Sequence, residues 1–217
     1  MSQPIKAVLF DLDGTLLDTQ DLILASFRYA TTEVLGQKIP DELLLAKVGQ
    51  PLEVQMCDFT DDPALQKELV DVYRDYNHAV HDERVRAFDG IVEMLDWLAG
   101  AGYRMGVVTS KRQALAQRGL DVCGLAKYME FVVAPDVFPI HKPDPAPVVH
   151  ACELMGLDPA ECLYVGDSPF DIAAGNGAGC ETVAVTWGMF SAEVLADEDP
   201  MYVIGHPSDF ANLSVLH

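Results

Sequence analysis

Short apolar runs alternate with helical patterns through most of this 217-residue chain, and this alternation restricts the fold more than any other feature. The apolar runs are Ala7–Phe10, Met105–Val108, Phe131–Ala134, Leu163–Val165, Thr182–Val185 and the weaker Tyr202–Ile204. Runs of this length are typical of strands buried on both faces of a parallel sheet. The segments between them carry helical periodicity, as from Ile91 to Leu98. The sequence therefore predicts an α/β fold with a Rossmann-like, doubly wound parallel sheet.

Residues 18–87 interrupt this alternation, because they contain no convincing strand. Asp21–Leu35 is periodic in apolar residues, and a second helix is predicted to begin at Pro63 with Asp62 as its N-cap. An all-helical insertion after the first strand is the simplest explanation. We therefore expect a core of residues 1–17 and 88–217 and a helical subdomain of residues 18–87, joined by two short connections.

The segment Asp11-Leu12-Asp13-Gly14-Thr15 directly follows the first predicted strand. Ligands of open α/β sheets bind beyond the carboxyl ends of the strands, so this position favours a functional role. Two carboxylates at i and i+2 can both face the crevice if the backbone turns, and Gly14 permits a turn. Their like charges repel unless a cation or a proton lies between them. Capping of the following turn by the two aspartates is the structural alternative.

Three further polar segments lie at the ends of predicted strands or at the start of a helix. Thr109 follows one strand in Val107-Val108-Thr109-Ser110-Lys111, and Gly166-Asp167-Ser168-Pro169-Phe170-Asp171 follows another. Lys142 in His141-Lys142-Pro143-Asp144-Pro145 precedes a predicted helix. In this order, the four segments resemble the four motifs of the haloacid dehalogenase superfamily of phosphohydrolases. The helical insertion lies where this superfamily places its mobile cap.

The resemblance implies a role for each matching residue. Asp11 would be the nucleophile that forms an aspartyl-phosphate, and Asp13 would be the general acid and base. Mg²⁺ would be bound by Asp11, the backbone carbonyl of Asp13 and Asp167, with Asp171 as an outer or water-mediated ligand. Thr109 and Lys142 would bind the phosphoryl oxygens and complete the catalytic set.

Substrate contacts are expected from Gly14, Thr109, Ser110, Lys111, Lys142 and the cap residue Gln50. A solvated surface position for Lys111 is as compatible with the sequence as substrate binding. His78 and His81 lie at i and i+3 without a metal-ligating partner, so we expect a partly exposed helix face there. The cap sequence, including Tyr76–His78, resembles those of phosphoglycolate phosphatases and related inorganic pyrophosphatases. The resemblance thus implies a small phosphorylated substrate, either an ester or an anhydride.

The charge of the chain restricts its partners. There are 14 Lys and Arg against 34 Asp and Glu, a formal net charge of −20, which disfavours binding to nucleic acid or to an anionic membrane. All the basic residues lie at or before Lys142. Five cysteines without a C-x-x-C pair, and no apolar run of transmembrane length, predict a cytoplasmic protein. A monomer or a weak homodimer is expected.

Two other functions stay open at the level of sequence. A phosphomutase of the β-phosphoglucomutase type shares the cap and all four motifs, although such mutases tend to carry Val where this chain has Thr15. A non-catalytic phosphate-binding regulatory protein would have lost at least one chemical group, whereas Asp11, Asp13 and Lys142 are all present.

Overall fold

The computed structural model describes residues 4–216. Its main sheet has six strands in the order β5-β4-β1-β6-β7-β8, and all neighbouring strands are parallel. The predicted α/β fold is confirmed, and each predicted strand is present with ends within one residue of the prediction. The strands are β1 (Ala7–Phe10), β4 (Arg104–Val108), β5 (Val132–Val133), β6 (Cys162–Gly166), β7 (Glu181–Val185) and β8 (Tyr202–Ile204).

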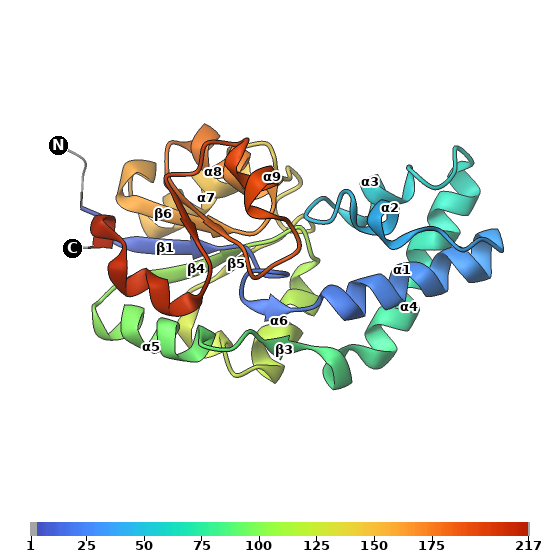
Figure 1. The fold of residues 1–217 in the computed structure, drawn as a ribbon, viewed down its shortest axis with the longest axis horizontal. Helices are drawn as coiled ribbons and strands as arrows, with labels where there is room; N and C mark the ends of the chain where they lie inside the picture. Colours follow the sequence, from blue (N-terminus) through green and yellow to red (C-terminus); the bar gives the residue numbers. More distant parts are fainter. Residues whose placement is uncertain (1–3, 217) are drawn as a thin grey trace.

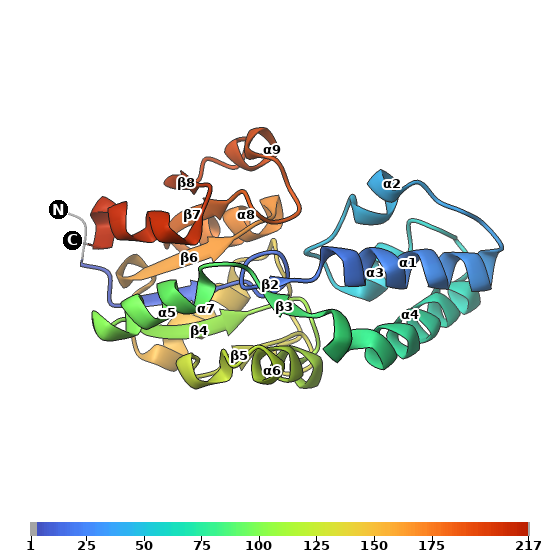
Figure 2. The ribbon, with the colours of Figure 1, turned by 60° about the horizontal axis from the view of Figure 1, so that its bottom comes forward.

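Helices cover both faces of this sheet (Figures 1 and 2). Val8 and Phe10 of β1 face α5 (Ile91–Gly100) and α6 (Gln113–Val122), whereas Ala7 and Leu9 face α7 (Ala146–Met155) and α8 (Pro169–Ala178). This division follows from the alternation of side chains along a strand. Shorter elements complete the core: α9 (Ala192–Ala196), η1 (Ala126–Tyr128), η2 (Pro159–Glu161), η3 (Pro207–Asn212) and η4 (Ser214–Leu216).

The helical segment forms a second layered unit beyond the sheet (Figure 1). It consists of α1 (Gln20–Leu35), α2 (Asp41–Leu45), α3 (Leu52–Met56) and α4 (Pro63–Arg84). Its apolar side chains, including Phe27 and Leu69, form a cluster of their own, and Met189 of the core packs against that cluster. As predicted, the Asp62 side chain caps α4 by accepting a hydrogen bond from the amide of Ala64. Each unit therefore has its own apolar core.

Two short strands in the connections between these units were missed by the sequence analysis. β2 (Leu17–Asp18) and β3 (Arg86–Ala87) pair in antiparallel fashion. Two residues are too few to produce a period-2 pattern, so no sequence signal could identify them. We propose this pair as the border between a core of residues 1–17 and 88–217 and a cap of residues 18–87.

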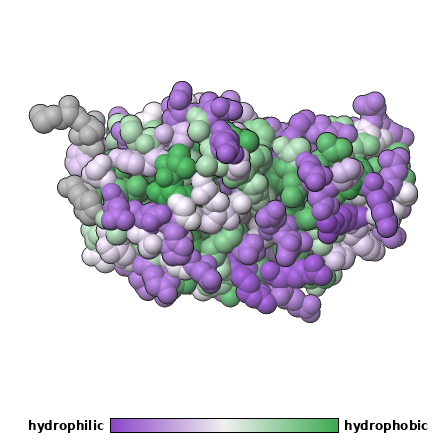
Figure 3. Space-filling model, in the orientation of Figure 1, coloured by the Kyte–Doolittle hydropathy of each residue, from purple (hydrophilic) through white to green (hydrophobic). Residues whose placement is uncertain are grey.

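Hydrophilic residues are spread over both units on the face shown in Figure 3, with hydrophobic residues in small groups between them. Among residues 4–216, no helix combines the length and the apolarity that are needed to cross a bilayer.

Candidate active site

The carboxyl ends of β1, β4 and β6 place three predicted site residues at one edge of the sheet. Phe10 of β1 is in register with Val107 of β4 and with Val165 of β6. The residues that follow these strands, Asp11, Thr109 and Asp167, are consequently neighbours, and each is at most 6% exposed. The parallel register alone accounts for this convergence of residues far apart in sequence.

Lys142 lies at the centre of the site, with 2% of its surface exposed. Its Nζ donates hydrogen bonds to Asp11 Oδ1 at 2.7 Å, to Asp171 Oδ1 at 2.5 Å and to the carbonyl oxygen of Val108 at 3.2 Å. An ammonium group has three donors, so all of them are satisfied. A surface position for Lys142 is therefore excluded.

Three buried carboxylates form a cluster here, and two of them, Asp11 and Asp171, bond to this ammonium group. Oxygen atoms of Asp11, Asp167 and Asp171 all lie within 4.8 Å of one another. Burial raises the pKa of Asp11 to about 7, although Lys142 acts in the opposite direction. Burial, together with the charges of Asp11 and Asp171, also raises the pKa of Asp167. The cluster thus contains more negative charge than Lys142 balances.

This donor set fits Mg²⁺. Carboxylate oxygens are the ligands that a hard divalent cation prefers, and a second cation would offset the repulsion that raises the pKa of Asp167. Asp11 uses one oxygen for Lys142, and each oxygen of Asp167 accepts one hydrogen bond, from the Thr15 hydroxyl and from the Met189 amide. Each oxygen of Asp171 accepts two hydrogen bonds from protein donors, which uses all its lone pairs. The fit is therefore best for Asp11 and Asp167 as direct ligands.

Asp171 is held in place by contacts that sequence reasoning did not anticipate. Its Oδ2 accepts hydrogen bonds from the Ser168 backbone amide and from Ser168 Oγ at 2.6 Å. The bond from the Ser168 amide, together with the bond from the Asp171 amide to Ser168 Oγ, forms a capping box at the start of α8. The hydroxyl of Tyr164 donates to Oδ1 at 3.3 Å. The spacing Ser-x-x-Asp was a visible signal for this capping box.

Two glycines pack tightly around Asp167. A Cβ atom at Gly14 would lie 2.2 Å from Asp167 Oδ2, and one at Gly188 would lie 2.3 Å from the same oxygen. Gly14 also has a φ of +85°, which L residues rarely adopt. Gly188, which the sequence analysis did not select, carries no local pattern that could have identified it. Both positions require glycine because Asp167 occupies the space.

Asp13 and Lys111 face each other on the cavity side of the site. Lys111 Nζ lies 2.6 Å from Asp13 Oδ1, and their side chains are only 10% and 15% exposed. The Lys111 backbone amide also donates to Thr109 Oγ1 at 3.1 Å. The structure thus decides against a solvated surface position for Lys111.

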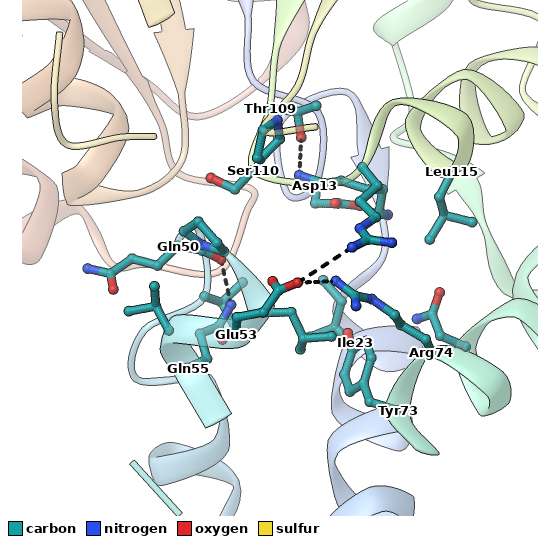
Figure 4. Close-up of a pocket in the computed structure, with 18 of the residues that line it drawn as sticks. Asp13, Ile23, Gln50, Glu53, Gln55, Tyr73, Arg74, Thr109, Ser110 and Leu115 are labelled. Atoms are coloured by element: carbon teal, nitrogen blue, oxygen red, sulfur yellow. Dashed lines mark hydrogen bonds and ion pairs between the residues drawn. The ribbon is translucent and has the colours of Figure 1, made fainter. Parts of the chain in front are cut away.

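A cavity of about 750 Å³ lies between the core and the helical unit (Figure 4). The core contributes Asp11, Asp13, Thr109, Ser110 and Lys111, and the helical unit contributes Gln50 among others. Ser110 Oγ donates a 2.5 Å hydrogen bond to the carbonyl oxygen of Gly49, so the two units also touch directly. The predicted cap residue Gln50 accordingly shares one cavity with Asp11.

The two histidines of α4 differ from the prediction and from each other. His78 is exposed and contributes to the cavity wall, whereas His81 is 0% exposed. The predicted partial exposure of His81 is therefore wrong. The residue lies beside Gly119 of α6, where a Cβ atom would be 3.7 Å from His81 Nε2, an ordinary van der Waals distance. Nδ1 of His81 lies 2.8 Å from Asp82 Oδ1.

Comparison with known proteins identifies the family. The sequence profile of the haloacid dehalogenase-like hydrolases matches residues 8–185. Pyrophosphatase PpaX of Bacillus velezensis is 35% identical over 217 residues, which span 97% of this chain and 96% of that protein. The crystal structure of a predicted phosphoglycolate phosphatase from Haemophilus somnus superposes with a TM-score of 0.90 at 25% identity, covering 99% of this chain and 100% of the other.

A second solved structure, a predicted phosphatase from Clostridium acetobutylicum, is 26% identical, with a TM-score of 0.86 and coverage of 97% and 98%. These similarities extend over the core and the helical segment alike. The chain belongs to the haloacid dehalogenase-like hydrolase family, within its phosphatases.

Proposed function

We propose that this protein is a Mg²⁺-dependent phosphohydrolase that cleaves a small phosphate ester or anhydride through an aspartyl-phosphate on Asp11. The observation that carries this proposal is the geometry of Asp11. Its carboxylate is buried, is bonded to Lys142 through one oxygen and belongs to the cluster that fits Mg²⁺, and Asp11 also lines the cavity.

Asp11 is suited to nucleophilic attack because its two oxygens differ. Oδ1 accepts the hydrogen bond from Lys142 at 2.7 Å, and this contact fixes the orientation of the carboxylate. The second oxygen is then the one that attacks phosphorus, and the leaving group departs on the cavity side. The covalent intermediate divides one difficult displacement into two easier ones.

Asp13 is the general acid and base of the proposed reaction. It follows Asp11 by two residues, lines the same cavity and is bonded to Lys111. When a substrate arrives, Lys111 can leave Asp13 for the phosphoryl oxygens. Asp13 is then free to carry the proton that the leaving oxygen needs, and later to remove a proton from the attacking water.

Positive charge and hydrogen-bond donors for the phosphoryl group come from residues around Thr109. Thr109 and Lys111 line the cavity, and Lys142 lies behind Asp11. Ser110 also lines the cavity, and its hydroxyl donates to the carbonyl oxygen of Gly49 in this structure. These groups are placed to stabilise the charge that develops on the equatorial oxygens.

Mg²⁺, held by Asp11, Asp167 and the Asp13 carbonyl with Asp171 behind them, would neutralise charge on the phosphoryl group. Lys142 keeps Asp11 oriented before any cation binds, because its three hydrogen bonds are formed by protein atoms alone.

Pyrophosphate and phosphoglycolate are the substrates we place first. The names of the relatives, a pyrophosphatase and a phosphoglycolate phosphatase, support both. The cavity is much larger than one phosphate group, so it has room for a leaving group as well. A cytoplasmic location and a monomeric or weakly dimeric state stay predictions.

A phosphate-release screen tests the reaction. Purified protein is assayed with pyrophosphate, phosphoglycolate, a sugar phosphate and p-nitrophenyl phosphate, each with Mg²⁺ and with EDTA. We expect release that needs Mg²⁺ and is lost in Asp11→Asn. Phosphate release that survives in Asp11→Asn would contradict the nucleophile assignment.

The covalent intermediate needs a separate test. Asp13→Ala is expected to form the aspartyl-phosphate and to hydrolyse it slowly, since the base that activates water is missing. Borohydride reduction followed by peptide mass spectrometry should then label Asp11. Unlabelled Asp11 together with normal turnover would show that water attacks the substrate directly.

A further inference from the structure

The cavity has a second charged cluster, away from the carboxylates that fit Mg²⁺. It consists of Arg74 on α4, Glu53 on α3 and Arg112, which immediately follows Lys111 and is the N-cap of α6. The first two residues come from the cap and the third from the core. In Figure 4, the carboxylate of Glu53 lies inside the cavity, with dashed lines toward two guanidinium groups.

The distances in this cluster leave most of its donors unused. Arg74 donates one hydrogen bond to Glu53 Oε1 at 2.6 Å. Arg112 lies 3.9 Å from the same oxygen, which is too far for a hydrogen bond. Within residues 4–216, the guanidinium of Arg112 donates no hydrogen bond. Since each guanidinium has five N–H donors, one carboxylate cannot satisfy both arginines.

A structural role explains Arg74 better than Arg112. The ion pair between Glu53 and Arg74 joins two cap helices and is an ordinary stabilising contact. A latch between cap and core would require a short contact, as Ser110 makes with Gly49 at 2.5 Å. Arg112 faces Glu53 across the domain border without such a contact, so its charge is available to a third group.

No other acidic residue of the cavity wall among residues 4–216 forms an ion pair with Arg112, and this holds also for Asp75, which follows Arg74. Asp136 accepts a hydrogen bond from the Gln113 amide, and Asp13 is paired with Lys111. The bond from Arg74 lowers the pKa of Glu53 although partial burial acts in the opposite direction, so Glu53 is ionised at neutral pH. The cluster itself thus has two arginines for one carboxylate, although Asp75 and Asp136 also line the cavity.

We propose that Arg74 and Arg112 bind a second anionic group, carried by the leaving group of the substrate. Glu53 then acts as an internal carboxylate that occupies Arg74 until the second anion of the substrate displaces it. The inference rests on the proposed function for the phosphoryl end of the substrate. Arginine matches phosphate and carboxylate with two parallel hydrogen bonds, so either chemistry suits the site. Substrates with two anionic groups are therefore preferred over simple monoesters.

Equilibrium binding measured by titration calorimetry in Mg²⁺ tests this site without turnover. The probes are methylenediphosphonate, phosphonoacetate and, with one anionic group, methylphosphonate. We expect the wild type to bind at least one of the two-anion probes about tenfold or more tightly than methylphosphonate. Whichever of them binds more tightly identifies phosphate or carboxylate as the second group.

Single substitutions test whether the two cavity arginines bind the probe, or whether any arginine of the protein has the same effect through its charge. Arg74→Gln and Arg112→Gln should each weaken binding of the preferred probe about ten- to a hundredfold, with methylphosphonate binding nearly unchanged. Arg84→Gln is the matched control, since Arg84 is exposed on the same helix α4 outside the cavity. Glu53→Gln should strengthen binding of the preferred probe, because the internal competitor is removed.

The outcomes distinguish this site from the proposed reaction. Equal binding of one-anion and two-anion probes by the wild type overturns the inference, as does unchanged binding in both arginine variants. Arginine-dependent preference without phosphate release from any substrate supports the anion site and overturns the proposed reaction. Phosphate release and binding that do not depend on Arg74 or Arg112 support the proposed reaction and overturn the anion site.

Discussion

Replacing Lys142 by methionine should destabilise the folded protein strongly. Methionine has a similar shape but no charge, so Asp11 and Asp171 would lose their common cation. Their side chains are 6% and 0% exposed, and water therefore cannot replace the ammonium group. Removal of one partner of a buried ion pair costs about 3–5 kcal/mol, and we expect a loss in that range at pH 8 without divalent cations.

The loss should be smaller at pH 6. Burial raises the pKa of Asp11 to about 7 while Lys142 is present. Because Lys142 lowers this pKa, the removal of Lys142 should raise it further. A carboxyl whose pKa is raised in the folded state destabilises that state as the pH rises, because the unfolded chain releases the proton more easily. The variant should thus recover part of its stability on acidification.

Urea denaturation followed by circular dichroism measures this difference, and Lys111→Met is the matched control. Lys111 pairs with Asp13 at the cavity wall, where the Asp13 side chain is 15% exposed. Because solvent can reach that carboxylate, we expect a loss of only about 1 kcal/mol. Equal losses in the two variants, or a loss below about 1 kcal/mol for Lys142→Met, would refute the reasoning that burial makes Lys142 essential.

Three further perturbations probe the site and its surroundings. Mg²⁺ at ten times its Kd should stabilise the wild type by about 1.4 kcal/mol in thermal unfolding, and Asp167→Asn should remove most of this gain. Gly14→Ala should lower the free energy of unfolding by about 1–3 kcal/mol and weaken the stabilisation by Mg²⁺, because its Cβ would lie 2.2 Å from Asp167 Oδ2. Unchanged stabilisation by Mg²⁺ would mean that Asp167 can move without loss of the metal site. Burial lowers the pKa of His81, so the wild type should lose stability as the pH falls below the ordinary histidine range. His81→Gln should lack this component, and identical pH profiles would show that His81 protonates without cost.

The core of the fold and the polar ends of its strands could be predicted from sequence for a physical reason. A strand buried on both faces has to be apolar throughout, so Ala7–Phe10 and Leu163–Val165 are visible without any knowledge of their neighbours. Once these strands are parallel, their carboxyl ends lie at one edge. The meeting of Asp11 and Asp167 follows from that arrangement, although they are far apart in the chain.

The cap is less predictable because its contacts are tertiary. α2 and α3 have five residues each, too few for a helical period to emerge. The burial of His81 depends on its packing beside Gly119, on another helix. Similarly, Glu53, Arg74 and Arg112 come together only through the packing of three helices, and nothing in their local sequence marks them as one cluster.

The uneven distribution of charge along the chain has a structural explanation in this site. Residues after Lys142 contribute Asp167 and Asp171 to the carboxylate cluster but have no Lys or Arg. The positive groups of the cavity, namely Lys111, Arg112 and Arg74, all come from the preceding part of the chain. A net charge of −20 disfavours the approach of an anion at long range, so the attraction must be local. Cap and core each contribute basic groups to that local attraction, and Arg74 and Arg112 lie near one another only when α4 and the start of α6 face the same cavity.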